Sequence, residues 1–557
     1  MLPRAPGHRD LTGRGRRVEH TRPTLRAKYL SPDRNRPGGG VVSTTTTTRS
    51  STGYEQELHR GVGTFASFAA GFSFVSILTT VFQLFGLGFL LGGASFFWAW
   101  PAVFVGQLFV ALCFAELAGR WPVSGAIFQW SSRLAGTSWG WFTGWIMIVG
   151  QILTVAVAAI AIQAVLPAIW SGFQLVGGSD ADPSILSETG AKNAVVLGII
   201  LLAITTLVNI LGIRQMAATT SVGVAVEIVG VVILIGVLFA LSERGPSVVL
   251  HTTGWEGTGN YFFAWLASSL MAAYVMVGFD SAGELAEETH SPRKTTPKTI
   301  IRALTTSGLG GGLLILGALM AAPSLTDGNL SSLGLSWVIT ERLGDVFGRL
   351  LLCCVAVAVF ACTLAVQTSG ARMTYSMARE GALPFSKALA RVSPRTGTPV
   401  ITSIVVGVGA AVALAVNVNS TTIFTALSSI CIAMLYIAYL GVTLPLLVVR
   451  IKHRNTDHFP AGHDEDGKPL FSMGRFGIPV NVAAVIYQAI MIVNLMWPRP
   501  EIYDLSTDGN WLLQYSAVLF VGAVVAVGAA YFGWKRLHHR IDLPHIPHTH
   551  LVAEDAA

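Results

Sequence analysis

Long apolar stretches joined by short polar connections fill the chain from residue 64 onward. An apolar run of about 20 residues crosses the ~30 Å hydrocarbon core of a bilayer as an α-helix. A helix is needed because lipid offers no hydrogen-bond partner for a free backbone amide. We count twelve such stretches, at 64–86, 95–118, 138–167, 193–212, 219–241, 260–280, 298–322, 345–368, 399–417, 421–449, 478–497 and 512–534. The pattern predicts an all-α polytopic membrane protein with twelve transmembrane helices.

Composition agrees with a membrane protein and excludes several other classes. Of the 557 residues, 52% are hydrophobic and 12% are charged, whereas soluble proteins carry about 25% charged residues. A soluble chain of this length would need more charge to cover the surfaces of its domains. The five cysteines all lie in apolar stretches without metal-ligand spacing. They are therefore interpreted as small buried side chains rather than as a disulfide scaffold.

The two ends of the chain differ in composition from the apolar body. Residues 1–60 contain 12 Lys and Arg against 5 Asp and Glu, and so account for the whole net charge of +7. This segment has too little apolar surface to fold, and we expect a disordered, basic cytosolic tail. Residues 536–557 contain five histidines and predict a His-rich cytosolic tail, solvated rather than metal-binding. The membrane domain is expected between them, at 61–535.

The distribution of Lys and Arg predicts the orientation of the helices. If the N-terminus is cytosolic, 32 of these residues fall in cytosolic segments and 5 in outer segments. Cytosolic loops carry the excess of positive residues in membrane proteins. One missed or extra helix would invert every later loop and remove this bias. We therefore expect twelve helices with both termini in the cytoplasm.

A charged residue at the end of the sixth stretch indicates a functional position. Asp280 is surrounded by Gly278, Ser281 and Gly283. Charges inside spanning segments are costly and tend to be functional, and glycine weakens a helix by about 1 kcal/mol relative to alanine. A helix that breaks here would free backbone groups near the middle of the membrane. The alternative is a helix that ends at Gly278 and leaves Asp280 at the interface.

The first stretch has a related feature. Ser73, Ser76, Thr79 and Thr80 place small hydroxyl groups in its middle, where they can bond to the preceding turn and let the helix bend or open. They can equally be helix-packing residues. If the chain consists of two five-helix repeats, 61–241 and 260–449, followed by two helices at 478–534, the first and sixth stretches correspond. Interrupted helices at corresponding positions are typical of a transporter binding site.

Two further polar residues lie inside spanning stretches. Glu227, in the middle of the fifth, is a candidate for proton binding or for pairing with a cation, and a structural hydrogen bond is the alternative. Gln151, in the third, could line a cavity or make an interhelical hydrogen bond. No nucleotide-binding loop, metal-spaced cluster or catalytic triad signature accompanies them. We expect no enzyme activity, no cofactor, no metal and no nucleic-acid partner.

Three motifs carry a family resemblance. They are FAELAGRWPVSGAIFQW at 114–130, GFDSAG at 278–283 with EET at 287–289 and PR at 292–293, and SGARMTYSMAREGALP at 369–384. Together they resemble the amino acid–polyamine–organocation permeases, in the branch of amino acid, GABA and choline permeases. The resemblance extends over about residues 54–535. It implies a LeuT-like fold of ten helices in two inverted five-helix repeats, plus two C-terminal helices.

The resemblance also implies a substrate site at the breaks of the first and sixth helices. There, Ser76, Ile77, Leu78, Thr79 and Thr80 would present backbone amides to a substrate carboxylate. Carbonyls of Gly278, Phe279, Asp280 and Ser281 and the Asp280 carboxylate would receive an amino group. Tyr274 matches an aromatic gate position, and Ser73 and Gln151 complete the predicted substrate-binding set.

The chain departs from this family at two positions. Ser76-Ile77-Leu78-Thr79 stands where many relatives have a Gly-Ser-Gly type motif, so carboxylate recognition is in doubt. Some proton-coupled relatives have a lysine in the fifth helix, whereas this chain has Glu227 and no lysine there. A choline-like or polyamine-like substrate therefore stays open.

The function implied is secondary active transport of an amino acid or related amine across the plasma membrane by alternating access. Proton symport is expected, with Asp280 and Glu227 as coupling residues. The alternatives are choline, GABA or polyamine transport, substrate exchange, and a ligand sensor that transports nothing. The expected partners are the small-molecule substrate, the lipid bilayer and the proton.

Overall fold

A computed structural model describes residue 58 and residues 61–185, 187–257, 259–416, 418, 423–453, 462–463, 467–503 and 510–538. Residues 1–57 and 59–60 of the predicted N-terminal tail lie outside the described residues. So do residues 539–557 of the predicted C-terminal tail. Within these ranges the chain is helical, and its only β-type pairings are isolated bridges at Val62–Thr289 and His463–Pro469.

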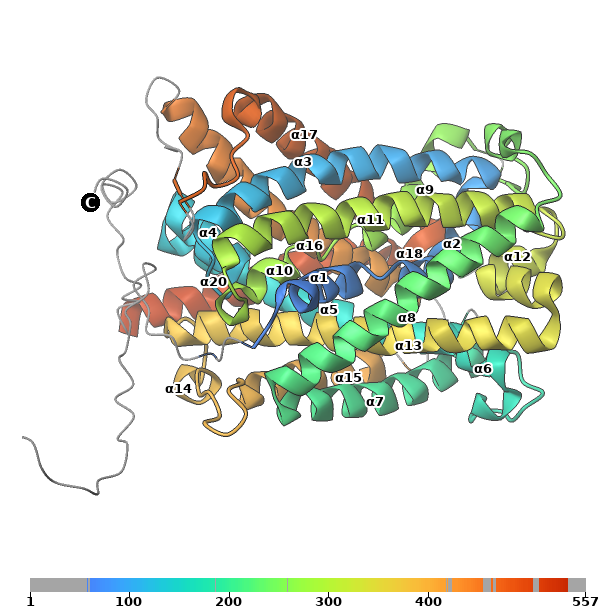
Figure 1. Cartoon of the computed structure of the whole chain (residues 1–557), viewed down its shortest axis with the longest axis horizontal. Coiled ribbons are helices and arrows are strands. Elements are labelled where there is room, and N and C mark those ends of the chain that lie inside the picture. Colours follow the sequence, from blue (N-terminus) through green and yellow to red (C-terminus); the bar gives the residue numbers. More distant parts are fainter. Residues whose placement is uncertain are drawn as a thin grey trace, which may run out of the picture. The chain divides into compact units, whose positions relative to one another are not determined.

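Each of the twelve predicted stretches contains a helix (Figure 1). The principal helices are α1 (Thr64–Val75), α2 (Ile77–Gly92), α3 (Ala99–Arg120), α5 (Thr137–Ile160), α7 (Glu188–Leu211), α8 (Ile213–Ala240), α9 (Tyr261–Val275), α11 (Pro292–Ala321), α13 (Leu335–Arg379), α15 (Val400–Val416), α16 (Ile423–Lys452), α17 (Gly477–Met496) and α20 (Ser516–His538). Among the described residues, ten helical segments are long and apolar enough to cross a membrane. The helices α9 and α15 are apolar but shorter, with 15 and 17 residues. The protein is thus a multi-pass helical membrane protein, and twelve spans in two repeats stay a prediction.

Short helices fill the connections between the principal ones. They include α4 (Ala126–Ala135), α6 (Leu166–Ile169), α10 (Ser281–Glu284), α12 (Gly328–Ser332), α14 (Ser386–Leu389), α18 (Pro500–Tyr503) and α19 (Trp511–Gln514). Two 3-10 turns, η2 (Ala161–Ala164) and η5 (Ala286–Glu288), extend α5 and α10. The long helix α13 is interrupted at Gly344, whose backbone (φ 66°, ψ −177°) is not helical. The break directly precedes the eighth apolar stretch, which begins at residue 345.

The first segment is broken in its middle. The helix α1 ends at Val75, Ser76 adopts φ 33° and ψ 96°, and α2 begins at Ile77. A positive φ is unfavourable for a residue with a Cβ atom, so a non-glycine residue there marks a constrained position. The hydroxyl-rich middle of this segment therefore contains an interruption, which was one of its two interpretations from the sequence.

The sixth segment is broken as well. The helix α9 ends at Val275, earlier than the predicted boundary at residue 280, and α10 begins at Ser281. Gly278 lies between them with φ +93°, and a Cβ atom there would lie 1.7 Å from the Phe74 ring. Only glycine fits this close approach of the two breaks. Asp280 is completely buried in the bundle, so it is not an exposed residue at the end of a helix.

Burial places the broken first segment at the centre of the bundle. The most apolar window of α1–α2 is 83% buried, whereas that of α20 is 22% buried. The helix α1 packs against α8, α11, α13 and α10, and α2 packs against α9 (Figure 1). The C-terminal helices lie outside this centre, with α17 against α3 and α16, and α20 against α16 and α5. This arrangement surrounds both breaks with protein rather than lipid.

Candidate functional site

The break between α1 and α2 is held by a carboxylate from α8. Glu227 Oε1 accepts a hydrogen bond from the Ser76 hydroxyl at 2.9 Å and from the Leu78 amide at 3.2 Å. Glu227 is completely buried. A negative charge at the first turn of a helix is favoured by the free N–H groups and the helix dipole. The Glu227 side chain therefore occupies the Leu78 amide, one of the donors that the family resemblance assigned to a substrate carboxylate.

The remaining donors of this turn are used locally. The Thr79 amide donates to Ser76 Oγ at 3.4 Å, and the Thr80 amide donates to the Ser76 carbonyl at 3.1 Å. The Thr80 hydroxyl donates to the same carbonyl at 2.6 Å. Ser76 is therefore the central hydrogen-bonding residue of the break, because its amide, carbonyl and hydroxyl each form a hydrogen bond with a different neighbour.

The break between α9 and α10 is held by a tyrosine from α16. The Tyr439 hydroxyl donates to Asp280 Oδ1 and accepts the Gly278 amide at 2.9 Å. The rings of Phe279 and Phe114 lie beside it, with centroids 5.5 and 5.1 Å from the Tyr439 ring. The unwound backbone is therefore fixed by one hydroxyl group and enclosed by an aromatic wall.

Several buried polar atoms near the breaks have no hydrogen-bond partner among the described residues. They include Ser73 Oγ, Glu227 Oε2 and Asp280 Oδ2. Most buried polar atoms in proteins are satisfied, so such atoms call for a functional explanation. Neither Glu227 nor Asp280 forms an ion pair with a described basic side chain. A proton or a cationic group is the natural partner for these oxygens.

Most of the other predicted site residues also lie at the breaks. Ser281 donates from its hydroxyl to the Ala70 carbonyl of α1 at 3.4 Å. Tyr274 is buried on α9, close in sequence to the break. Gln151 differs, because it donates to Ser369 Oγ at 3.0 Å and joins α5 to α13. It makes the interhelical hydrogen bond that was its alternative interpretation.

Sequence reasoning missed two residues that build the site. Tyr439 lies in an apolar stretch where nothing distinguishes it from an ordinary packing aromatic. Phe74 likewise belongs to an apolar run, yet its ring contacts the position where Gly278 would carry a Cβ atom. A signal for Gly278 existed in its glycine-rich surroundings, but its partners come from distant helices.

Among the described residues, no group of His, Cys, Asp and Glu could hold a metal ion.

A set of buried ion pairs closes one end of the bundle. Glu288 meets Arg372 at 3.1 Å with both side chains fully buried, and Glu287 meets Arg379 at 2.9 Å. Glu116 pairs with Arg450. The connection between α10 and α11 is thus paired with α13 through Glu287 and Glu288. These contacts join α3, η5, α13 and α16 at the end that the charge distribution assigns to the cytosol.

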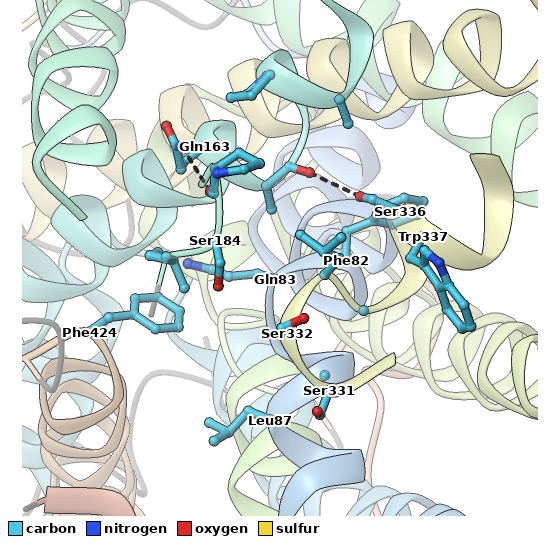
Figure 2. Close-up of a pocket in the computed structure, with 18 of the residues that line it drawn as sticks. Phe82, Gln83, Leu87, Gln163, Ser184, Ser331, Ser332, Ser336, Trp337 and Phe424 are labelled. Carbon is cyan, nitrogen blue, oxygen red and sulfur yellow. Dashed lines mark hydrogen bonds between the residues drawn. The ribbon is translucent and has the colours of Figure 1, made fainter. Parts of the chain in front are cut away.

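A cavity of about 250 Å³ lies beside α2 (Figure 2). One face of α2 lines it with Phe82, Gln83 and Leu87, and Trp337 contributes from the start of α13. Arg372 lies 28 residues beyond the interruption of α13 at Gly344, which corresponds to about 42 Å of helix at 1.5 Å per residue, and Trp337 lies before that interruption. The cavity contains none of the residues of the two breaks. The breaks therefore lie between a cavity on one side and the ion pairs on the other.

Comparisons with known proteins agree with this architecture. The family described as "Amino acid permease" matches residues 62–524. Amino-acid permease BAT1 of Arabidopsis thaliana is 29% identical over 518 residues, which cover 87% of this chain and 93% of the relative. Branched-chain amino acid permease BcaP of Bacillus subtilis is 23% identical over 509 residues, covering 88% and 97% of the two chains.

The helical bundle and its comparisons define a polytopic membrane transporter rather than an enzyme. The chain belongs to the amino acid permease family. The resemblance inferred from the three motifs is thereby confirmed, as is the expectation of an amino acid transporter.

Proposed function

We propose that the two helix breaks form the substrate site and that the protein takes up an amino acid by alternating access. The observation that supports this most directly is the pair of interrupted segments, α1–α2 and α9–α10, whose breaks approach each other at Phe74 and Gly278. Broken helices offer backbone dipoles and polar groups at membrane depth, where a small polar substrate needs them. The LeuT-like order of two five-helix repeats, with twelve spans, belongs to the same proposal.

Asp280 is proposed to receive the amino group of the substrate. Its Oδ1 atom is held by Tyr439, which fixes the side chain, and its buried Oδ2 atom has no hydrogen-bond partner among the described residues. A charge-assisted hydrogen bond from an ammonium group would satisfy that oxygen. The same carboxylate is a candidate for binding the co-transported proton when no ammonium is bound.

Glu227 is proposed to couple proton binding to recognition of the substrate carboxylate. Its carboxylate uses the Ser76 hydroxyl and the Leu78 amide, the same donors that a substrate carboxylate would require. Two carboxylates cannot share those donors in a buried site without strong repulsion. A protonated Glu227 is a weaker acceptor and releases them. Proton uptake and substrate binding would then favour each other, which is the requirement for symport.

The proposed substrate is a neutral amino acid with an apolar side chain. The aromatic wall of Phe114, Phe279 and Tyr439 and the buried Tyr274 favour an apolar group beside the breaks. Two relatives are named as branched-chain amino acid permeases, one from Lactococcus lactis and one from Bacillus subtilis. Choline, GABA and polyamines are the second group of candidates, because Asp280 and Glu227 are buried without a basic partner among the described residues.

The proposed orientation places both termini in the cytoplasm of a cell whose plasma membrane holds the protein. The ion pairs Glu288–Arg372 and Glu287–Arg379 lie at the end rich in Lys and Arg. In this orientation they seal the cytosolic side, and the cavity beside α2 faces outward. Opening inward would require these pairs to separate or to move together with their helices.

Reconstituted protein tests the proposal. Proteoliposomes are given radiolabelled leucine, GABA, choline or putrescine, with and without an inward proton gradient. We expect gradient-driven accumulation of leucine by the wild type. Glu227→Gln should lose the response to the gradient but retain leucine counterflow, and Asp280→Asn should lose leucine binding. Asp345→Asn, at an exposed carboxylate, is the matched control.

Three results would contradict parts of this proposal. Gradient-driven accumulation that is unchanged in Glu227→Gln would remove Glu227 as the coupling residue. Accumulation of choline or putrescine in place of leucine would replace the substrate class. Saturable leucine binding without flux would favour the ligand sensor over the transporter.

A further inference from the structure

The cavity beside α2 has the properties of a second ligand site. It is framed by α2, α6, the connection at 183–185, α12 with the start of α13, and the start of α16 (Figure 2). Pockets for drug-sized ligands measure roughly 300–1,000 Å³, so a cavity of about 250 Å³ suits a smaller molecule. None of its lining residues belongs to the α1–α2 break or to the α9–α10 break.

One polar atom in the lining lacks a partner. Gln83 donates from Nε2 to the Val157 carbonyl at 2.7 Å, which fixes the orientation of its amide. Its Oε1 atom is buried and has no hydrogen-bond partner among the described residues. Of the other polar side chains of the lining, Ser336 donates to the Ala164 carbonyl at 2.9 Å and Thr425 to the Ile502 carbonyl at 2.6 Å. The cavity therefore offers a buried acceptor for a donor group on a ligand.

The charge of the lining defines the class of ligand. None of the described residues that line the cavity is ionisable. Phe82, Leu87, Leu90 and Phe424 provide apolar surface. A carboxylate or an ammonium placed here would lose water without gaining an ionic partner, and this costs several kcal/mol. An uncharged molecule avoids that cost.

We propose that this cavity binds a small uncharged molecule with an apolar body and one hydrogen-bond donor, which bonds to Gln83 Oε1. The site is distinct from the central substrate site, since the two share no residue. An aromatic or alkyl primary amide combines the required features. Its N–H group donates to Gln83, and its apolar body packs on α2 and α16.

Occupancy of this site should hinder movement of α2. At Gly86 the backbone of α2 approaches α12 so closely that a Cβ atom would lie 2.4 Å from the Ser331 carbonyl oxygen. Gly86 and Ser331 both line the cavity, so a ligand there lies beside the contact of α2 with α12. A molecule bound between α2 and α12 contacts both and opposes their relative movement. We therefore expect the ligand to inhibit uptake without competing for the central site. This inhibition rests on the proposed alternating access, whereas binding of the ligand to the cavity does not.

Calorimetry with the purified full chain tests binding directly. The probes are phenylacetamide and phenylacetate, which have the same ring and nearly the same shape but differ in charge and in donor groups. We expect saturable binding of phenylacetamide and at least tenfold weaker binding of phenylacetate. Gln83→Leu should weaken phenylacetamide binding roughly tenfold. Leu87→Trp should abolish it by filling the cavity.

Thr340→Val is the matched control in the same lining. The Thr340 hydroxyl donates to the Ser336 and Trp337 carbonyls of its own helix, both at 3.1 Å, so its loss should leave phenylacetamide affinity unchanged. In proteoliposomes phenylacetamide should lower the maximal rate of leucine uptake and leave its KM unchanged.

Several outcomes would overturn the proposal. They are no saturable binding of phenylacetamide, equal affinity for phenylacetate, and an unchanged affinity in Gln83→Leu. Competition between phenylacetamide and leucine in a binding assay would place the probe in the central site instead. If both variants fold poorly, the comparison of the two probes on the wild type still decides, because equal affinities refute an uncharged, donor-dependent site. Leucine flux that fails altogether would refute the transport proposal while leaving the calorimetric result intact.

Discussion

Adding one methyl group at Gly278 tests how closely the two helix breaks approach each other. Gly278 has φ +93°, and a Cβ atom there would lie 1.7 Å from Cδ1 and 2.3 Å from Cε1 of Phe74. A left-handed backbone costs an L-residue roughly 1–2 kcal/mol, and overpacking a buried site costs about 1–3 kcal/mol more. Gly278→Ala should therefore lower the free energy of unfolding by roughly 2–5 kcal/mol, and leucine uptake should fall with it.

A second glycine separates the two contributions. Gly381 has φ +67° and no atom within 4 Å of an added Cβ, so Gly381→Ala should cost only the backbone part, roughly 1–2 kcal/mol. Unfolding is measured in mixed detergent micelles, with the fluorescence of the protein as the readout. Combining Gly278→Ala with Phe74→Leu should recover the overpacking part, and a double-mutant cycle measures that coupling. A cost equal to that of Gly381→Ala, or no coupling to Phe74→Leu, would refute the close approach of the two breaks.

Two further predictions concern buried polar contacts. Arg372→Met removes the buried ion partner Arg372 from Glu288 and should lower the free energy of unfolding by about 3–5 kcal/mol. The control Arg349→Met, in an exposed pair, should lower it by less than about 1 kcal/mol. Equal losses in the micelle unfolding assay would argue against the buried pair. Tyr439→Phe removes the hydroxyl that holds Asp280 and should lower the ratio of maximal rate to KM for leucine uptake roughly tenfold, a result that unaltered uptake kinetics would contradict.

Much of the architecture could be predicted because it depends on local pattern. Apolar runs of about 20 residues identify helices in a membrane protein without knowledge of their neighbours. The hydroxyl cluster around Ser76 and the glycines around Asp280 indicated both breaks, because those residue types weaken a helix wherever they occur. The end of α9 was placed five residues too late, since an apolar residue such as Met276 gives no local signal for unwinding.

The partners of the break residues could not be predicted in the same way. Glu227 is 151 residues from Ser76 in sequence, and Tyr439 is 159 residues from Asp280. Either contact requires several helices to pack in a particular order, and the sequence of one helix face does not specify which distant face it meets. The sequence suggested Glu227 for proton binding or cation pairing and Gln151 for lining a cavity, with a structural hydrogen bond as the alternative for each. In the structure Glu227 lies at the break, and Gln151 joins α5 to α13.

The amino-acid sequence by itself determined that this chain is a helical membrane protein and roughly where its helices lie, and it indicated the interruptions near Ser76 and Gly278. Those properties follow from hydrophobicity and from backbone preferences, which act over a few residues. Only the tertiary structure decided that Glu227 occupies the donors at Ser76 and Leu78, that Tyr439 fixes Asp280, and that a neutral cavity lies beside α2. The physical reason is that hydrogen bonds and cavities in a bundle depend on packing between helices distant in sequence.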